Sequence, residues 1–260
     1  MPQLKSLVRT QLLRANNAVG RRLDPTVRAA ATPDSLTVEL RTLFSRLSIS
    51  HVLDVGAHRG GFYGRLRTDV GYQGRVTSFE PSPTHYQKLL QVASGDPNWT
   101  AINVALGAEA GVAEFHQYMG EGHDGQCDSI LTLGPHAAVF KPEWSLEKTT
   151  IGVTVQRLDS VWPQLDAVSA ETFLKVDTQG FDLEVLAGGG ELLAQFPAVL
   201  LEVAVKPIYL GAPVVADVFA AMTANRFELT GAFPIHRYDS GLRVIEFDCT
   251  FVNQRLFEPD

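Results

Sequence analysis

Short apolar runs alternate along this chain with segments whose apolar residues recur at helical intervals. Apolar and β-branched residues predominate in His51–Val55, Arg75–Glu80, Trp99–Val104, Phe173–Val176 and Ala198–Val203, and we predict a strand at each. Helical spacing predicts helices at 36–47, 63–70, 84–93, 183–193 and 214–224. Because strands that alternate with helices form a mostly parallel sheet with helices on both faces, the predicted fold class is α/β.

Weaker strand patterns and a long irregular stretch complete the chain. Alternating apolar residues predict further strands at 113–118, 151–158, 227–230 and 244–252. Residues 119–150, rich in Gly, His and Asp, are predicted to form an irregular insertion or substrate loop. No internal repeat and no linker divides the rest. We therefore expect one domain at residues 49–260, preceded by a helical extension or cover at residues 1–48.

The N-terminal extension is basic and amphipathic. The first thirty residues contain one acid, Asp24, and six cationic residues, which are Lys5, Arg9, Arg14, Arg21, Arg22 and Arg28. Apolar residues share one face of the predicted helix, among them Leu4, Leu12 and Val19. The simplest interpretation is a helix that packs on the domain or on a partner subunit, which suggests a homodimer. A cover for the substrate site, a membrane-surface helix and a transit-like segment are the alternatives.

Composition excludes several classes of protein. The net charge of −7 argues against nucleic acid as the partner. No apolar run approaches the roughly 20 residues of a transmembrane helix. The only cysteines, Cys127 and Cys249, are too few for a disulfide framework or a thiolate metal cage, which favours a reducing cytoplasm.

Three predicted strands end in an acidic residue. Asp54, Glu80 and Asp177 lie at the carboxyl ends of three strands in chain order, and Gly56 comes directly after the first strand. Ligands of such sheets bind beyond the carboxyl ends of the strands, where a glycine lets them approach the main chain. Glu80 suits the hydroxyls of a ribose. The carboxylate of Asp54 would repel the pyrophosphate of NAD, but it can accept hydrogen bonds from the ammonium group of a methionine. This difference favours S-adenosylmethionine over NAD as the cofactor.

Five motifs of this sequence resemble the FkbM family of S-adenosylmethionine-dependent methyltransferases. They are Val52–Gly60 (VLDVGAHRG), Ser78–Pro83 (SFEPSP), Asn103–Gly107 (NVALG), Gln156–Ser160 (QRLDS) and Phe173–Gly188 (FLKVDTQGFDLEVLAG). The resemblance covers residues 50 to 205. It implies a Rossmann-like class I methyltransferase fold with a mostly parallel seven-stranded sheet. It also implies O-methylation of a hydroxyl, often on a sugar, a glycoside or another natural product.

Cofactor contacts are expected at the three acidic strand ends and their turns. From the residues we assign Asp54 to the methionine ammonium, Glu80 to the ribose, and Gly56 and Ala57 to close main-chain approach. The resemblance adds the residues that share its motifs, with the pair after the third strand lying near the adenine: His58, Pro81, Ser82, Gln179, Val104 and Ala105.

Catalysis and acceptor binding are expected near Asp177. Donor and acceptor should meet there, and its carboxylate could take the proton of the acceptor hydroxyl. His236 and His123 are the other candidate bases. Ser129 lies in a segment that resembles a serine-containing segment of the family, and we assign it and Glu202 to the substrate. If a divalent cation activates the hydroxyl instead, Asp177, Asp182 and Glu202 are its candidate ligands.

Three other functions fit the sequence less well. An NAD-linked oxidoreductase is disfavoured by Asp54 and by the absence of the third glycine of the dinucleotide motif. A nucleic-acid methyltransferase would need a basic face, and the core of this chain is acidic. A non-catalytic, cofactor-binding subunit of a biosynthetic complex is the remaining alternative, although the retained acids at three strand ends argue against it.

Overall fold

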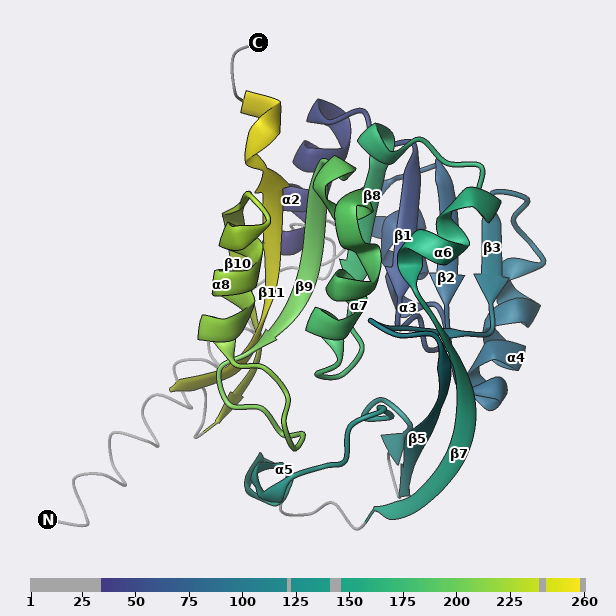
Figure 1. Ribbon diagram of the computed structural model, residues 1–260, viewed down its shortest axis with the longest axis vertical. Helices are drawn as coiled ribbons and strands as arrows, with labels where there is room; N and C mark the ends of the chain where they lie inside the picture. Colours follow the sequence, from purple (N-terminus) through teal and green to yellow (C-terminus); the bar gives the residue numbers. More distant parts are fainter. Residues whose placement is uncertain (1–33, 121–122, 141–145, 239–241, 258–260) are drawn as a thin grey trace, which may run out of the picture. The chain divides into compact units, whose positions relative to one another are not determined.

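The computed structural model describes residues 34–120, 123–140, 146–238 and 242–257 (Figure 1). Ser35–Asp260 form one compact unit. Residues 1–33 lie outside the described residues, so the amphipathic helix predicted there and the dimer contact it suggested stay predictions.

A seven-stranded sheet forms the centre of the described unit, in the order β10-β11-β9-β8-β1-β2-β3. Its strands are β1 (His51–Val55), β2 (Arg75–Phe79), β3 (Trp99–Ile102), β8 (Thr172–Val176), β9 (Ala198–Ala204), β10 (Phe227–Tyr238) and β11 (Arg243–Asn253). The neighbours from β3 to β9 pair in parallel, whereas β11 runs antiparallel to β9 and β10 antiparallel to β11. This confirms the predicted α/β fold with its mostly parallel sheet.

Helices cover both faces of this sheet, as Figure 1 shows. Every residue of β1 and β8 is buried, as expected for central strands covered on both sides. One face packs against α2 (Ser35–Arg46), α3 (Gly61–Arg65) with its π-helical continuation η1 (Leu66–Val70), and α4 (Pro83–Ala93). The other face packs against α6 (Leu158–Val161), α7 (Asp182–Gly189) and α8 (Val215–Ala224). Short 3₁₀ turns are η2 (Trp162–Gln164), η3 (Ser169–Glu171), η4 (Gly190–Gln195) and η6 (Gln254–Phe257).

The helix α2 falls within the segment 1–48 that the sequence analysis assigned to an extension. In the structure Leu40 is fully buried, and Leu36, Leu43 and Phe44 join the same core cluster as β1 residue Val52. Burial of four large side chains on one helical stripe is worth several kcal/mol, at about 1.5–3 kcal/mol each. This helix is therefore part of the core of the unit.

A second, four-stranded sheet with the order β4-β7-β5-β6 lies near the carboxyl ends of the central strands (Figure 1). It contains β4 (Ala105–Leu106), β5 (Gly111–Gly120), β6 (His123–Asp124) and β7 (Glu147–Gln156), with α5 (Pro135–Phe140) between β6 and β7. β5 and β7 form a long antiparallel pair from Gly111–Val155 to Met119–Glu147. The segment 119–150 is thus more regular than predicted, because both strands extend into it.

Candidate functional site

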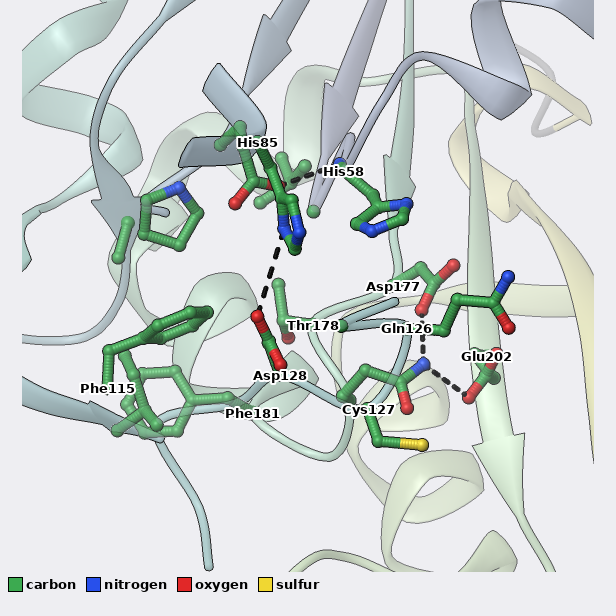
Figure 2. Close-up of a pocket in the computed structure, with 18 of the residues that line it drawn as sticks. His58, His85, Phe115, Gln126, Cys127, Asp128, Asp177, Thr178, Phe181 and Glu202 are labelled. Atoms are coloured by element: carbon green, nitrogen blue, oxygen red, sulfur yellow. Dashed lines mark hydrogen bonds and ion pairs between the residues drawn. The ribbon is translucent and has the colours of Figure 1, made fainter. Parts of the chain in front are cut away.

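A cavity of about 410 Å³ opens beyond the carboxyl ends of β1, β2, β8 and β9. Its walls include the residues that follow those strands, the turn after β3, and part of the small sheet (Figure 2). This is the position at which sheets of this type bind ligands. Of the predicted cofactor residues, those that line it are Gly56, His58, Glu80, Pro81, Val104, Ala105, Asp177 and Gln179.

The turn after β1 is tightly determined. Gly56 has φ +76°, and a Cβ there would lie 1.8 Å from the carbonyl oxygen of Asp177. Only glycine therefore fits where the turns after β1 and β8 touch. Ala57 is buried in the core and is not among the cavity-lining residues. His58 has φ +49°, an uncommon conformation for a non-glycine residue, and its N–H points at a carboxylate.

That carboxylate belongs to Glu80, which is 4 % exposed. One oxygen accepts the N–H of His58 at 2.7 Å, and the other accepts the N–H of Ser82 at 2.8 Å. Burial raises the pKa of Glu80 to about 8, although these two N–H groups oppose the shift. Ser82 itself is buried and caps α4, where its Oγ accepts from the N–H of His85. Glu80 is thus held in one orientation at the cavity wall.

A buried ion pair lies behind the wall. Asp54 is fully buried, and its Oδ1 lies 2.9 Å from the Nζ of Lys175. The same ammonium donates to the carbonyl of Gly56 at 3.1 Å and lies 3.5 Å from Oδ2 of Asp177. Burial alone would lower the pKa of Lys175, but the carboxylates of Asp54 and Asp177 raise it overall. Asp54 does not line the cavity, so its predicted contact with an ammonium group stays a prediction.

Lys175 is a residue beside the site that the sequence analysis did not identify. Asp54 and Lys175 are register partners in β1 and β8, each the second-last residue of its strand. The sequence did contain a signal for this ion pair. Each of the two apolar strands carries one charged residue at the same distance from its end, and the two charges are of opposite sign.

Asp177 belongs to a side-chain network on the part of the cavity wall that follows β8. Nε2 of Gln179 donates to Oδ1 of Asp177 at 2.9 Å and to Oε1 of Glu202 at 3.2 Å (Figure 2). The hydroxyl of Tyr209 lies 2.8 Å from Oε1 of Gln179. Burial, followed by the charge of Asp177 and further carboxylates, raises the pKa of Glu202 well above its usual range. The predicted acceptor-side residues Asp177 and Glu202 therefore meet in one cavity.

A histidine–carboxylate pair lines the same cavity. His236 lies in β10 directly opposite Glu246 of β11, between two register shifts of the strand pair. Its Nδ1 is 2.9 Å from Oε2 of Glu246, and both residues line the cavity. Irregularities of this kind redirect side chains at the ends of sheets. His123 lies in β6, and its side chain is outside the described part of the chain.

Ser129 lies beside the cavity and supports its wall. It is 1 % exposed, and its Oγ donates to the carbonyl of Gln179 at 2.9 Å and accepts the N–H of Leu131 at 3.0 Å. It is absent from the lining of the cavity, and its assignment to the substrate is still a prediction. In this position Ser129 joins the small sheet to the turn after β8.

The structure does not support the metal alternative. Among the described residues, no group of three or more His, Cys, Asp or Glu side chains is arranged to hold a metal ion. Of the predicted ligands, Asp182 turns onto its own loop, where it accepts the N–H of Thr178 at 3.0 Å and the hydroxyl of Thr178 at 3.1 Å. Both of these hydrogen bonds use one oxygen of Asp182, Oδ1, in a local capping contact.

Residues 54–229 match the family described as the methyltransferase FkbM domain. This chain belongs to that family. The methyltransferase is also 24 % identical over 208 residues to 2-O-methyltransferase NoeI of Sinorhizobium fredii, a match that covers 79 % of this chain and 80 % of the relative.

Solved structures similar to the methyltransferase include two proteins with bound S-adenosylmethionine. Magnesium protoporphyrin IX methyltransferase from Synechocystis is 13 % identical with a TM-score of 0.46, and the match covers 85 % of this chain and 78 % of the other. Fibrillarin from Aeropyrum pernix is 12 % identical with a TM-score of 0.44, covering 77 % and 66 % respectively, so this chain spans about two thirds of that fibrillarin.

The cofactor of the methyltransferase is S-adenosylmethionine, and the cavity fits it. A buried carboxylate at the end of β2 can accept from ribose hydroxyls, and the turn at Gly56 admits main-chain approach. Val104, Ala105 and Phe181 supply an apolar surface for a flat base.

In the described part of the chain no helix is long and apolar enough to cross a membrane.

Proposed function

We propose that the chain is an O-methyltransferase whose acceptor is a hydroxyl of a sugar, a glycoside or another small natural product. One observation carries the proposal: Asp177, His236 and Glu246 line the same cavity as Glu80. A hydroxyl held by these groups would share the cavity with a donor whose ribose is bound by Glu80. The relative NoeI is a 2-O-methyltransferase, which supports the same reaction class.

Each group then has a defined task. The bound cofactor supplies an electrophilic methyl group on a sulfonium. The acceptor oxygen forms its bond to that carbon while the carbon–sulfur bond breaks and its electron pair passes to sulfur. Asp177, whose carboxylate is fixed by Gln179 and Lys175, orients the hydroxyl, and alignment of this kind supplies much of the rate.

His236 receives the hydroxyl proton in this proposal. Pairing with Glu246 holds the imidazole in one orientation. Glu202 hydrogen-bonds further hydroxyls of the acceptor. Asp54 pairs with Lys175, which in turn holds the carbonyl of Gly56 and the carboxylate of Asp177, and these two acceptors can face the methionine ammonium.

The decisive experiment incubates the full chain with methyl-labelled S-adenosylmethionine and a panel of sugars and glycosides, with mass spectrometry of the products. Transfer of the label to oxygen supports the proposal. Tight binding of S-adenosylhomocysteine in calorimetry without transfer to any hydroxyl would favour the non-catalytic subunit instead. Label found only on nitrogen or carbon would overturn O-methylation.

Two variants separate the assigned tasks. His236→Asn should lower kcat by about 10²–10⁴-fold and remove the acidic limb of the pH–rate profile, with little change in the affinity for S-adenosylhomocysteine. Asp177→Asn should lower turnover more than it weakens cofactor binding. Full activity in either variant would remove that residue from the reaction.

Location and assembly belong to the same proposal. Both cysteines are free and buried, which fits a reducing cytoplasm. A homodimer formed through the N-terminal segment can be tested by sedimentation of the full chain and of a chain beginning at Ser35. A monomer at both lengths would contradict it.

A further inference from the structure

The ionisable lining of the cavity is mostly acidic. Five carboxyl groups line it, and they belong to Glu80, Asp128, Asp177, Glu202 and Glu246. Among the described residues of the lining there is no lysine and no arginine. A carboxyl group carries no positive charge in either protonation state, so none of the five can neutralise an anion.

Histidine is the one residue type in this described lining that can become positively charged. Nδ1 of His236 lies 2.9 Å from Glu246, and Nδ1 of His85 lies 3.8 Å from Asp128, so each already has a carboxyl group beside it. The ring centroids of His58 and His85 are 4.2 Å apart, and a charge on one ring disfavours a charge on the other. The histidines therefore leave little positive charge for a ligand.

Lys175 lies behind the wall, and its charge is already shared. Its ammonium lies 2.9 Å from a carboxylate oxygen of Asp54 and 3.5 Å from one of Asp177, and the residue is not part of the cavity lining. Because two carboxyl groups flank this one ammonium, it has no excess positive charge to offer a ligand of the cavity.

The pKa of Glu202 reflects the electrostatic potential in this part of the cavity. Burial raises it well above its usual range, and four carboxylates act in the same direction, those of Asp177, Glu246, Asp182 and Asp248. The pKa of its register partner Asp248 is raised to about 6, first by burial and then by Asp177. Lys175 and Arg65 oppose that shift without reversing it. The interactions that disfavour a negative charge on Glu202 also disfavour one on a ligand beside it.

We propose that the cavity selects its acceptor by charge: it takes a hydroxyl compound that is neutral or carries an amine, and it excludes phosphorylated and carboxylated ones. The inference rests on the proposed function and narrows its class of acceptor. An anionic group beside the reacting hydroxyl would lose its hydration and find no counter-charge, so its burial is costly. A neutral polyol can donate hydroxyl hydrogen bonds to the same carboxyl groups.

The methyl donor does not supply the missing cation. It is net positive, with an ammonium and a sulfonium against one carboxylate, and so fits the same acidic lining. Methyl transfer removes the sulfonium charge, so an attraction between that charge and an anionic acceptor would weaken on the way to the transition state. An anionic acceptor is therefore disfavoured in the reaction as well as in binding.

The experiment compares acceptors of the same shape that differ in charge. In the label-transfer assay, the full chain is given methyl glucoside, the methyl glycoside of glucuronic acid and the neutral amide of that acid, with the same three forms of each other sugar in the panel. The acid and its amide have nearly the same size. In the wild type, kcat/KM for the amide should exceed that for the acid by at least about 10–100-fold.

Gln126 is a position at which the missing cation can be added. It is exposed, it lines the cavity, and Figure 2 shows it on the same side of the view as Asp177 and Glu202. Gln126→Lys should raise kcat/KM for the acid by about 3–10-fold and leave that for the amide nearly unchanged. Gln126→Met, which has a similar length and no charge, is the matched control and should leave the ratio of the two at its wild-type value. Because the position is exposed, the Tm of both variants should stay close to that of the wild type.

Each other outcome is decisive. A wild type that methylates the acid as well as the amide would overturn the inference. A ratio in Gln126→Lys equal to that in Gln126→Met would also overturn it, because the discrimination would then follow shape and not charge. Absence of transfer to every member of the panel would instead overturn the proposed function itself.

Discussion

Replacing Lys175 by methionine should destabilise this domain far more than a typical surface change. The ammonium lies 2.9 Å from a carboxylate oxygen of Asp54, which is fully buried, and 3.1 Å from the carbonyl of Gly56. Methionine keeps the length and apolar contacts of the stem but leaves Asp54 charged and without its cation. Removing one partner of a buried pair costs about 3–5 kcal/mol. Asp177 adds less to this figure, because a third of its side chain is exposed to water.

Urea unfolding followed by intrinsic fluorescence measures this loss. For a domain of this size, about 3–5 kcal/mol corresponds to a fall in Tm of roughly 6–20 °C. The double variant Asp54→Asn with Lys175→Met removes both charges and should regain most of the loss, since an uncharged replacement of a buried pair is often close to neutral. Lys206→Met, at an exposed position, is the matched control and should change stability by less than about 0.5 kcal/mol.

The double variant gives the sharper outcome. If the loss comes from an uncompensated buried charge, the two changes are strongly non-additive. A double variant as unstable as the sum of the single ones would mean that Lys175 acts through packing alone. A loss below about 1 kcal/mol in Lys175→Met would show that Asp54 is solvated or protonated in the folded chain.

Two further predictions concern β1 and its turn. Burial, with the charge of Arg75, lowers the pKa of His51 to about 4, so the folded chain loses stability as the pH falls from 6.5 toward 4. The free energy of unfolding should therefore fall by about 2–3 kcal/mol more between pH 7.5 and pH 4.5 in the wild type than in His51→Gln. Gly56→Ala should destabilise the folded chain by more than about 2 kcal/mol, because Gly56 has a positive φ and a Cβ there would meet the carbonyl of Asp177. Gly64→Ala is the control: it lies in open space on α3 and should stabilise the folded chain by about 0.5–1 kcal/mol in the same denaturation assay.

The central strands could be predicted from the sequence because their burial leaves a direct trace in it. Strands buried on both faces are continuous apolar runs, and β1 and β8 are such runs with every residue buried. β1 carries an acid beside its last residue and β8 is followed directly by one, so Asp54, Glu80 and Asp177 could be placed at one edge of the sheet from the sequence alone. The apolar runs did not reveal that Asp54 forms an ion pair with Lys175.

The edge of the sheet was harder to predict because it breaks the local rules. β10 continues through Gly231 and Pro234 to Tyr238, although the sequence pattern indicated a strand only as far as residue 230. A proline is tolerated there because β10 is an edge strand, and the register shifts on either side of His236 absorb the irregularity. The same shifts bring His236 opposite Glu246, a pairing that no short-range pattern contains.

Backbone strain at the site is concentrated in the residues that hold its carboxylates. His58 and Gln179 have φ values of +49° and +56°, a conformation that costs a non-glycine residue about 1 kcal/mol or more. They lie in the turns after β1 and β8, which are neighbouring strands. In that conformation the N–H of His58 reaches Glu80, and the amide of Gln179 bridges Asp177 and Glu202. A fold that needed only two tight turns would place glycine at both positions, so the retained side chain of Gln179 argues that the arrangement of the carboxylates, and not the turn itself, determines the residue there.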